Sequence, residues 1–146
     1  MRVLVDTNVF LDLLIEREGT EEAFLFFKNC IVHRNETLLT SISLRDIGYI
    51  AHKYFHDNKK ARSLQAKAYQ FCTKVISITN DDAIESIYSD ISDYEDSLMV
   101  EAAKREMADL IVTNNIKDFK KARFPVWTPK EFNAAIEKIE QYGQNK

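Results

Sequence analysis

The sequence predicts a three-layer α/β/α sandwich built on a roughly five-stranded parallel sheet. Short apolar runs rich in β-branched residues, such as Val3 to Val5, alternate along the chain with longer amphipathic segments. This alternation is typical of a parallel sheet covered by helices on both faces. The chain has 146 residues, with only three glycines and two prolines. We therefore expect a single domain, residues 1–146, made mostly of regular structure.

The expected elements follow in order from apolar periodicity and from helix-capping patterns. Strands are expected at residues 2–6, 37–41, 75–78, 110–113 and 124–127. Helices are expected at residues 7–17, 21–32, 44–54 and 58–73, and from residues 80, 94 and 129 onward. N-caps are expected at Thr20, Ser43, Asp57, Thr79, Asp93 and Thr128.

Composition limits the classes of function. The net charge is −3 and the pI is about 5.6, so the chain as a whole has no basic footprint for nucleic acid. A metal-dependent site stays possible, because cations offset negative charge. The two cysteines lack zinc-site spacing. We see no signal peptide and no apolar run of about 18 residues, so we expect a cytoplasmic protein without a membrane span.

Acidic and amide side chains gather at the predicted carboxyl ends of the strands. Asp6 lies at the C-terminal end of the first expected strand, and Asp46 lies in the predicted first turn of the helix after the second strand. The helix that opens near Asp96 leads almost directly into the fourth strand, so its acidic N-terminus returns to the same edge. The loop after the fourth strand adds Asn114, Asn115 and Asp118. In open parallel sheets, ligands bind at this edge.

Each carboxylate also has a structural explanation. Asp6 precedes a helix as a cap does, and Asp46 and Asp96 occupy the predicted third positions of their helices, where a carboxylate satisfies backbone donors. Together, however, converging carboxylates repel one another unless a cation lies between them. All-oxygen ligands suit Mg²⁺ or Mn²⁺, and such sites typically carry out hydrolytic phosphoryl transfer.

Four ordered motifs resemble those of the PIN-domain nucleases. They are Val5-Asp6-Thr7-Asn8, Thr40-Ser41-x-Ser43-x-x-Asp46, Asp93-Tyr94-Glu95-Asp96 and Ile111-Val112-Thr113-x-Asn115-x-x-Asp118-Phe119. The resemblance spans almost the whole chain. Within the family, the sequence looks most like the bacterial VapC-like toxins of PIN-3 type.

The resemblance implies a parallel α/β/α sandwich and a Mg²⁺- or Mn²⁺-dependent endoribonuclease that is the toxin of a type II toxin–antitoxin pair. It implies an RNA substrate, a homodimer and a small antitoxin that blocks the site. The implied metal ligands or water-positioning carboxylates are Asp6, Asp46 and Asp96. The implied polar supports of the site are Asn8, Thr113 and Asn115.

Two positions depart from the family pattern. Residue 46 is Asp where many relatives have Glu, and residue 115 is Asn where many relatives have Asp. Asp118 can supply the missing charge, and we count it among the expected catalytic metal ligands. Without it, the site would hold one metal ion or hold metal weakly.

Other interpretations stay open at this point. One is a catalytically weak PIN module that binds RNA or a protein, favoured if Asn115 impairs the metal site. Another is a different phosphoryl enzyme, but a haloacid-dehalogenase-type phosphatase needs a second Asp where Asn8 stands. Residues 52–74 carry six cations and one carboxylate, a local charge of +5. This stretch either guides RNA toward the acidic edge or is a solvated helix face.

Overall fold

Five parallel strands form the central sheet in the order β3-β2-β1-β4-β5, in a computed structural model that describes residues 1–146. The strands are β1 (Arg2–Val5), β2 (Glu36–Thr40), β3 (Lys74–Ile76), β4 (Leu110–Val112) and β5 (Val126–Trp127). All four strand pairings are parallel. The predicted fold class is therefore confirmed, and every strand boundary lies within two residues of its predicted position.

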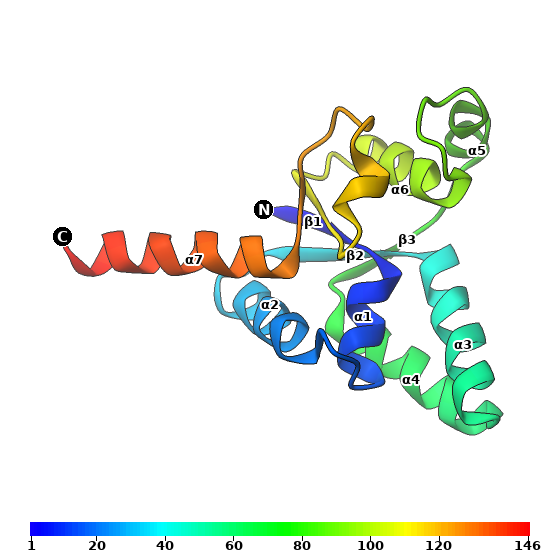
Figure 1. Cartoon of the computed structure of the whole chain (residues 1–146), viewed down its shortest axis with the longest axis horizontal. Coiled ribbons are helices and arrows are strands. Elements are labelled where there is room, and N and C mark those ends of the chain that lie inside the picture. The colour runs from blue at the N-terminus through cyan, green and yellow to red at the C-terminus, as the bar shows by residue number, and fades with distance from the viewer.

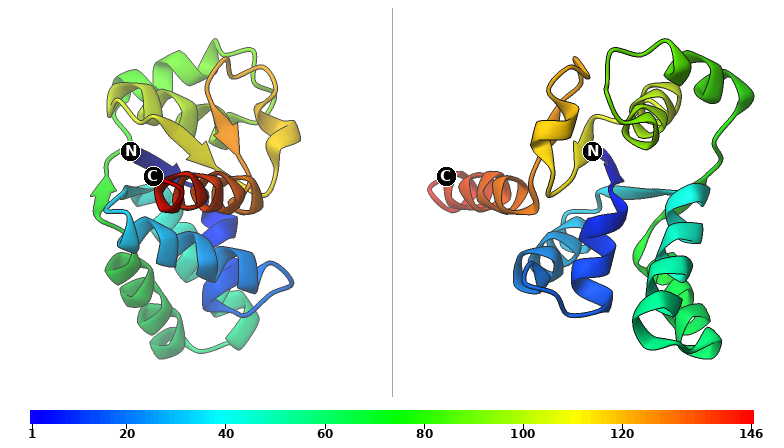
Figure 2. Two further views of the ribbon diagram at one scale, coloured as in Figure 1. Left: turned by 90° about the vertical axis from the view of Figure 1, so that its left-hand side faces the viewer. Right: turned by 45° about the vertical axis from the view of Figure 1, so that its right-hand side comes forward.

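Helices cover both faces of the sheet. They are α1 (Thr7–Leu14), α2 (Thr20–Val32), α3 (Ser41–Phe55), α4 (Asn58–Phe71), α5 (Asn80–Ile87), α6 (Tyr94–Arg105) and α7 (Pro129–Gln144), with a 3-10 helix, η1 (Ile116–Phe119). In Figure 1, α5 and α6 lie above the sheet, and α1, α2 and α4 lie below it. Both views in Figure 2 show the same separation. No helix has the length and apolar character needed to cross a membrane.

The middle strand, β1, is buried on both faces. Val3, Leu4 and Val5 are fully buried, as is usual for the apolar runs of parallel sheets. Leu4 pairs in register with Leu38 of β2 and Ile111 of β4. Because side chains alternate along a strand, Val3 and Val5 enter one core and Leu4 enters the other. The residue that follows β1 is thus held at the centre of the sheet edge.

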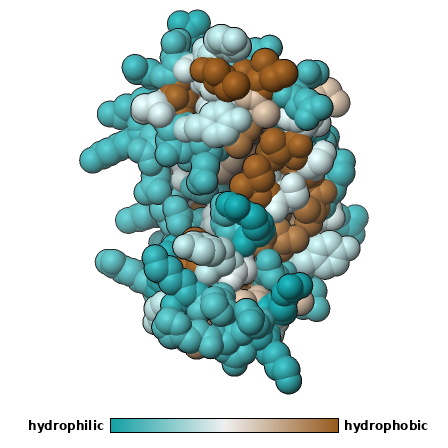
Figure 3. Space-filling model, turned by 90° about the vertical axis from the view of Figure 1, so that its right-hand side faces the viewer, coloured by the Kyte–Doolittle hydropathy of each residue, from teal (hydrophilic) through white to brown (hydrophobic).

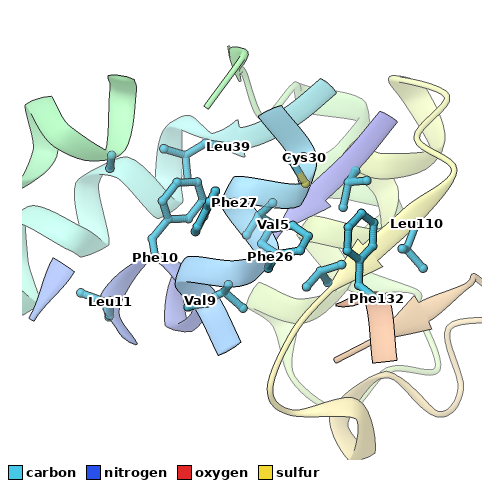
Figure 4. Close-up of a cluster of buried hydrophobic side chains, with 14 of the residues drawn as sticks. Val5, Val9, Phe10, Leu11, Phe26, Phe27, Cys30, Leu39, Leu110 and Phe132 are labelled. Atoms are coloured by element: carbon cyan, nitrogen blue, oxygen red, sulfur yellow. The ribbon is translucent and has the colours of Figure 1, made fainter. Parts of the chain in front are cut away.

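Four phenylalanines join three helices on one face of the sheet. Phe10 of α1 packs on Phe27 of α2 with ring centroids 4.8 Å apart. Phe26 of α2 packs edge-on against Phe132 of α7 at 4.9 Å. Figure 4 shows these rings beside Val5, at the end of β1. This packing fixes α1, and with it the segment that enters the site, against the sheet.

The structure confirms most helix starts. Asp57 accepts hydrogen bonds from the N–H groups of Lys59 and Lys60, and Thr79 and Thr128 form complete capping boxes. The predicted cap at Thr20 is wrong: Thr20 is the first residue of α2, and Gly19 precedes it without a side-chain cap.

Two helices end earlier than predicted. The first ends at Leu14 instead of residue 17, and α4 ends at Phe71 instead of residue 73. Glu16, just beyond the end of α1, has a φ of 53°. A left-handed residue cannot continue a right-handed helix.

Candidate active site

Asp6 lies at the end of β1 and is almost completely buried. It occupies the N-cap position of α1 but makes no side-chain capping hydrogen bond. Instead, its Oδ2 accepts a hydrogen bond of 2.7 Å from the hydroxyl of Thr113. Burial raises the pKa of Asp6, the Thr113 hydrogen bond opposes that rise, and the negative charge of Asp118 adds to it. Helix capping alone therefore does not explain why a buried carboxylate stands at this position.

Thr113 links Asp6 to the loop that follows β4. It is fully buried, directly after β4. Its hydroxyl oxygen accepts a hydrogen bond of 3.0 Å from the backbone N–H of Asn115 while donating to Asp6. Asn115 in turn precedes η1, which carries Asp118. A single hydroxyl thus holds a predicted metal ligand and the start of the loop that bears another.

The N-terminus of α6 brings a second carboxylate to the same place. Asp93 is the N-cap and accepts a hydrogen bond of 3.0 Å from the N–H of Asp96, so Asp96 is the third helical residue, as predicted. Burial raises the pKa of Asp96 to about 7, and the charges of Asp93, Asp6, Asp118 and Glu95 add to the rise. Asp96 is therefore close enough to Asp6 and Asp118 to feel their charges.

The predicted capping box at Ser43 and Asp46 is wrong. The cap of α3 is Thr40, which accepts a hydrogen bond from the N–H of Ser43, so the helix begins at Ser41. Asp46 is the sixth residue of α3 and lies in its second turn, away from the free N–H groups. Its Oδ1 is 2.6 Å from Nη2 of Arg45. Asp46 is therefore paired with its neighbour instead of capping a helix.

One open cleft of about 450 Å³ collects nearly all of the predicted residues. Six of the seven line it: Asp6, Asn8, Asp46, Asp96, Asn115 and Asp118. Thr113 does not line the cleft but lies beneath it, hydrogen-bonded to Asp6. The cleft also contains residues to which the sequence analysis gave no role in the site, namely Thr7, Tyr49 and Ile50. The residues predicted to converge do share one cleft, and their catalytic roles stay predictions.

The donors fit a hard cation in chemistry and in charge. They are carboxylates and amides without His or Cys, and burial and mutual repulsion oppose ionisation of Asp6 and Asp96. Yet no group of three or more His, Cys, Asp or Glu side chains lies close enough together to hold a metal ion. A cation bound directly by three of these carboxylates would therefore require them to move closer together.

The sequence patterns did not predict an ion pair between the buried Asp12 and the exposed Arg17. Asp12 of α1 is 7% exposed and accepts hydrogen bonds from Nε of Arg17, at 2.9 Å, and from Nδ2 of Asn114, at 2.6 Å. Arg17 also donates to the backbone carbonyl of Asn8. This network ties α1 to the loop that carries Asn115. The available signal was an Asp within the apolar run of residues 9–14, where an unpaired charge is costly.

A family comparison agrees with this geometry. The PIN-3 family model, described as PIN domain, matches residues 2–117. The chain belongs to the PIN domain family. The resemblance noted from the four motifs is thus confirmed. A comparison with curated protein sequences gives no match.

Solved structures share the fold of this PIN domain. FitAB bound to the IR36 DNA fragment has a TM-score of 0.71 at 14% identity, covering 87% of this chain and 94% of that chain. VapBC2 from Rickettsia felis, bound to a promoter DNA fragment, has a TM-score of 0.64 at 20% identity, covering 88% and 98%. Mycobacterium tuberculosis VapC20, described as a sarcin–ricin loop cleaving toxin, has a TM-score of 0.59 at 12% identity, covering 75% and 86%.

Proposed function

We propose that this PIN domain is an endoribonuclease that hydrolyses RNA phosphodiester bonds with Mg²⁺ or Mn²⁺. The observation that supports the proposal most is the uncompensated negative charge in the cleft. The charges of Asp6 and Asp118 help to raise the pKa of Asp96 to about 7, after burial, which contributes most. A fold does not keep repelling carboxylates in one cleft for stability, whereas a divalent cation would stabilise them.

Each residue has a distinct role in the proposal. Asp6, Asp46, Asp96 and Asp118 would hold the cation, which when bound supplies water activation and charge neutralisation at the phosphate. Thr113 fixes the orientation of Asp6 through its 2.7 Å hydrogen bond. Asn8 and Asn115 place amide groups in the cleft, where they can orient phosphate oxygens.

We further propose that the protein is the toxin of a toxin–antitoxin pair and forms a homodimer. Structures that share its fold include VapBC2 and FitAB complexes. Expression of the wild type is expected to arrest growth, and co-expression of a small protein encoded beside it is expected to restore growth. Arrest by the Asp6→Asn variant as well would show that the toxicity does not come from RNA cleavage.

A specific observation favours a second candidate, a PIN module that binds RNA or protein without cutting. Asp46 is already paired with Arg45 at 2.6 Å, position 115 carries no charge, and no three carboxylates are in place for a metal. This candidate predicts RNA or protein binding that neither metal nor the Asp6→Asn change affects.

The test is a metal-titrated cleavage assay on structured RNAs. The wild type is expected to cut RNA with Mg²⁺ or Mn²⁺, and EDTA is expected to stop it. Asp6→Asn and Asp96→Asn are expected to lower the rate at least about a hundredfold, because each removes a proposed metal ligand.

The matched control is Asp81→Asn. Asp81 is an exposed carboxylate on α5 that does not line the cleft. Its loss is expected to leave the rate within about twofold of wild type. Cleavage that persists in EDTA, or equal losses in all three variants, would overturn the proposal.

A further inference from the structure

A row of exposed cationic and aromatic side chains runs along α3. Arg45, Tyr49 and Lys53 follow one another at intervals of four residues, His52 lies beside them on the same helix face, and His56 directly follows the last helical residue. We call these five residues the α3 stripe. All five are exposed, and the side chain of Arg45 is 73% accessible. From Arg45 to Lys53 the stripe spans roughly 12 Å along the helix.

The stripe begins inside the candidate active site. Arg45 and Tyr49 both line the acidic cleft, beside Asp46. Arg45 is also bonded to Asp46, so its guanidinium stands at the edge of the carboxylate cluster. The remaining members continue along α3 toward its C-terminus. A chain bound along the stripe would therefore lead directly into the cleft.

The stripe belongs to a strongly basic part of the molecule. Residues 45–67 hold six Lys or Arg and two Asp, a net charge of +4. With a total of −3, the rest of the chain carries −7. In Figure 3, the face on the α3 side is hydrophilic in its lower half, at the level of α3 and α4. A part of the surface with this net charge complements a polyanion.

Exposed rings lie beside the cations at the end of the stripe. Tyr54 and Phe55 pack edge-on with centroids 4.8 Å apart, and Nζ of Lys60 is 5.2 Å above the ring of Phe55. Tyr49 itself is 67% exposed. Interleaved rings and cations are the combination that binds single-stranded nucleic acid, because bases stack on the rings and phosphates contact the cations.

We propose that the α3 stripe binds the single-stranded RNA that leads into the cleft, with phosphates at Arg45 and Lys53 and a base stacked on Tyr49. The inference rests on the proposed ribonuclease function. A single strand is favoured over a duplex, because a duplex does not expose base faces for stacking. A nucleic acid is favoured over an apolar protein surface, because no member of the stripe is aliphatic.

Binding is measured by fluorescence anisotropy with a labelled, unstructured 12-nucleotide RNA, in the Asp6→Asn background so that no RNA is cut. Tyr49→Ala and Lys53→Gln are each expected to weaken binding at least about fivefold. Lys53→Gln is also expected to reduce the slope of log K against log[salt] by about 0.7. Tyr49→Phe keeps the ring and is expected to bind within about twofold of its parent.

The matched controls are Tyr142→Ala and Lys138→Gln on α7, both exposed and remote in sequence from α3. They are expected to change binding by less than about twofold. Equal losses in stripe and control variants, or no loss in the stripe variants, would overturn the inference. So would a Tyr49→Ala variant that stops self-association in sedimentation but binds RNA normally, since the stripe would then contact a second copy. Failure of the wild type to cut RNA would instead count against the proposed function.

Discussion

At the scale of single residues, the candidate site is defined by carboxylates that the fold does not neutralise. Asp93 is committed to capping α6 through its 3.0 Å hydrogen bond to the N–H of Asp96. Asp46 is committed to Arg45. Asp118 makes no hydrogen bond or ion pair through its side chain, and its charge adds to the raised pKa values of Asp6 and Asp96, which burial chiefly causes. Asp118 is therefore free to bind a cation.

This difference predicts unequal effects of two conservative changes. Asp118→Asn is expected to weaken Mn²⁺ binding about tenfold, because it removes a free carboxylate from the cleft. Asp93→Asn is expected to weaken it less than about threefold, because Asn also caps helices well and the cap position is retained. Titration calorimetry with Mn²⁺ measures both. Equal losses of affinity would exclude a special role for Asp118.

At the scale of elements, the site depends on how α1 is joined to the segment after β4. Two contacts make this joint: Thr113 bonds Asp6, and Asn114 bonds the buried Asp12. Gly19 leaves room for the second contact, since a Cβ there would lie 2.3 Å from Oδ2 of Asp12. The loop that bears Asn115 is thus held by a side chain outside the cleft.

The hydrogen bond between Asn114 and Asp12 predicts that Asn114→Ala makes the loop after β4 more mobile. The variant is expected to lose about 1 kcal/mol of unfolding free energy, because one hydrogen bond is removed while Arg17 still pairs with Asp12. Amide hydrogen exchange at residues 116–119 is expected to become faster than in the wild type, with β1 unchanged. Unchanged protection of η1 would mean that Asp12 does not hold this loop.

The local sequence predicts most helices and strands correctly, and the wrong predictions have local causes. The caps at Thr79 and Thr128 were predicted because an Asp or Glu follows each threonine by three residues, which is the spacing of a capping box. At α3, Thr40 and Ser43 are both capping residues, and the sequence pattern selected the wrong one. Sequence patterns describe residue types, and the choice between two competent caps depends on where β2 ends.

At the scale of the whole molecule, a charged network joins β3, α5 and α6. Arg105 pairs with Asp82 at 3.0 Å, and Lys74 pairs with Glu106 at 3.2 Å. Burial alone would raise the pKa of Asp82, but hydrogen bonds from Arg105 and the Thr79 backbone outweigh it and lower that pKa. The pKa of Glu106 is likewise lowered, because Lys74 and Arg105 outweigh its burial.

This network predicts a loss of stability in acid. Both carboxyl groups have lower pKa values in the folded chain than in the unfolded chain. Their contribution is therefore complete above about pH 5 and is lost as the pH falls through the lowered values. Arg105→Gln is expected to cost about 2 kcal/mol of unfolding free energy at pH 7, and less at pH 3. Urea titration at pH 7 and at pH 3 measures the two losses of unfolding free energy. The matched control is Arg62→Gln, which changes an exposed arginine outside the network. An equal loss of unfolding free energy in this control would show that the ion pairs of Arg105 do not stabilise the fold.

The sequence by itself determined the alternation of strands and helices, the family motifs and the end of the sheet at which the acidic residues lie. Those properties depend on residue type and spacing, which are local. Only the tertiary structure decided which carboxylates are committed to caps or ion pairs, and that Asp12 supports the loop after β4. Pairings such as Asp12 with Asn114 join residues about a hundred positions apart, and packing of the whole chain, not local pattern, creates such contacts.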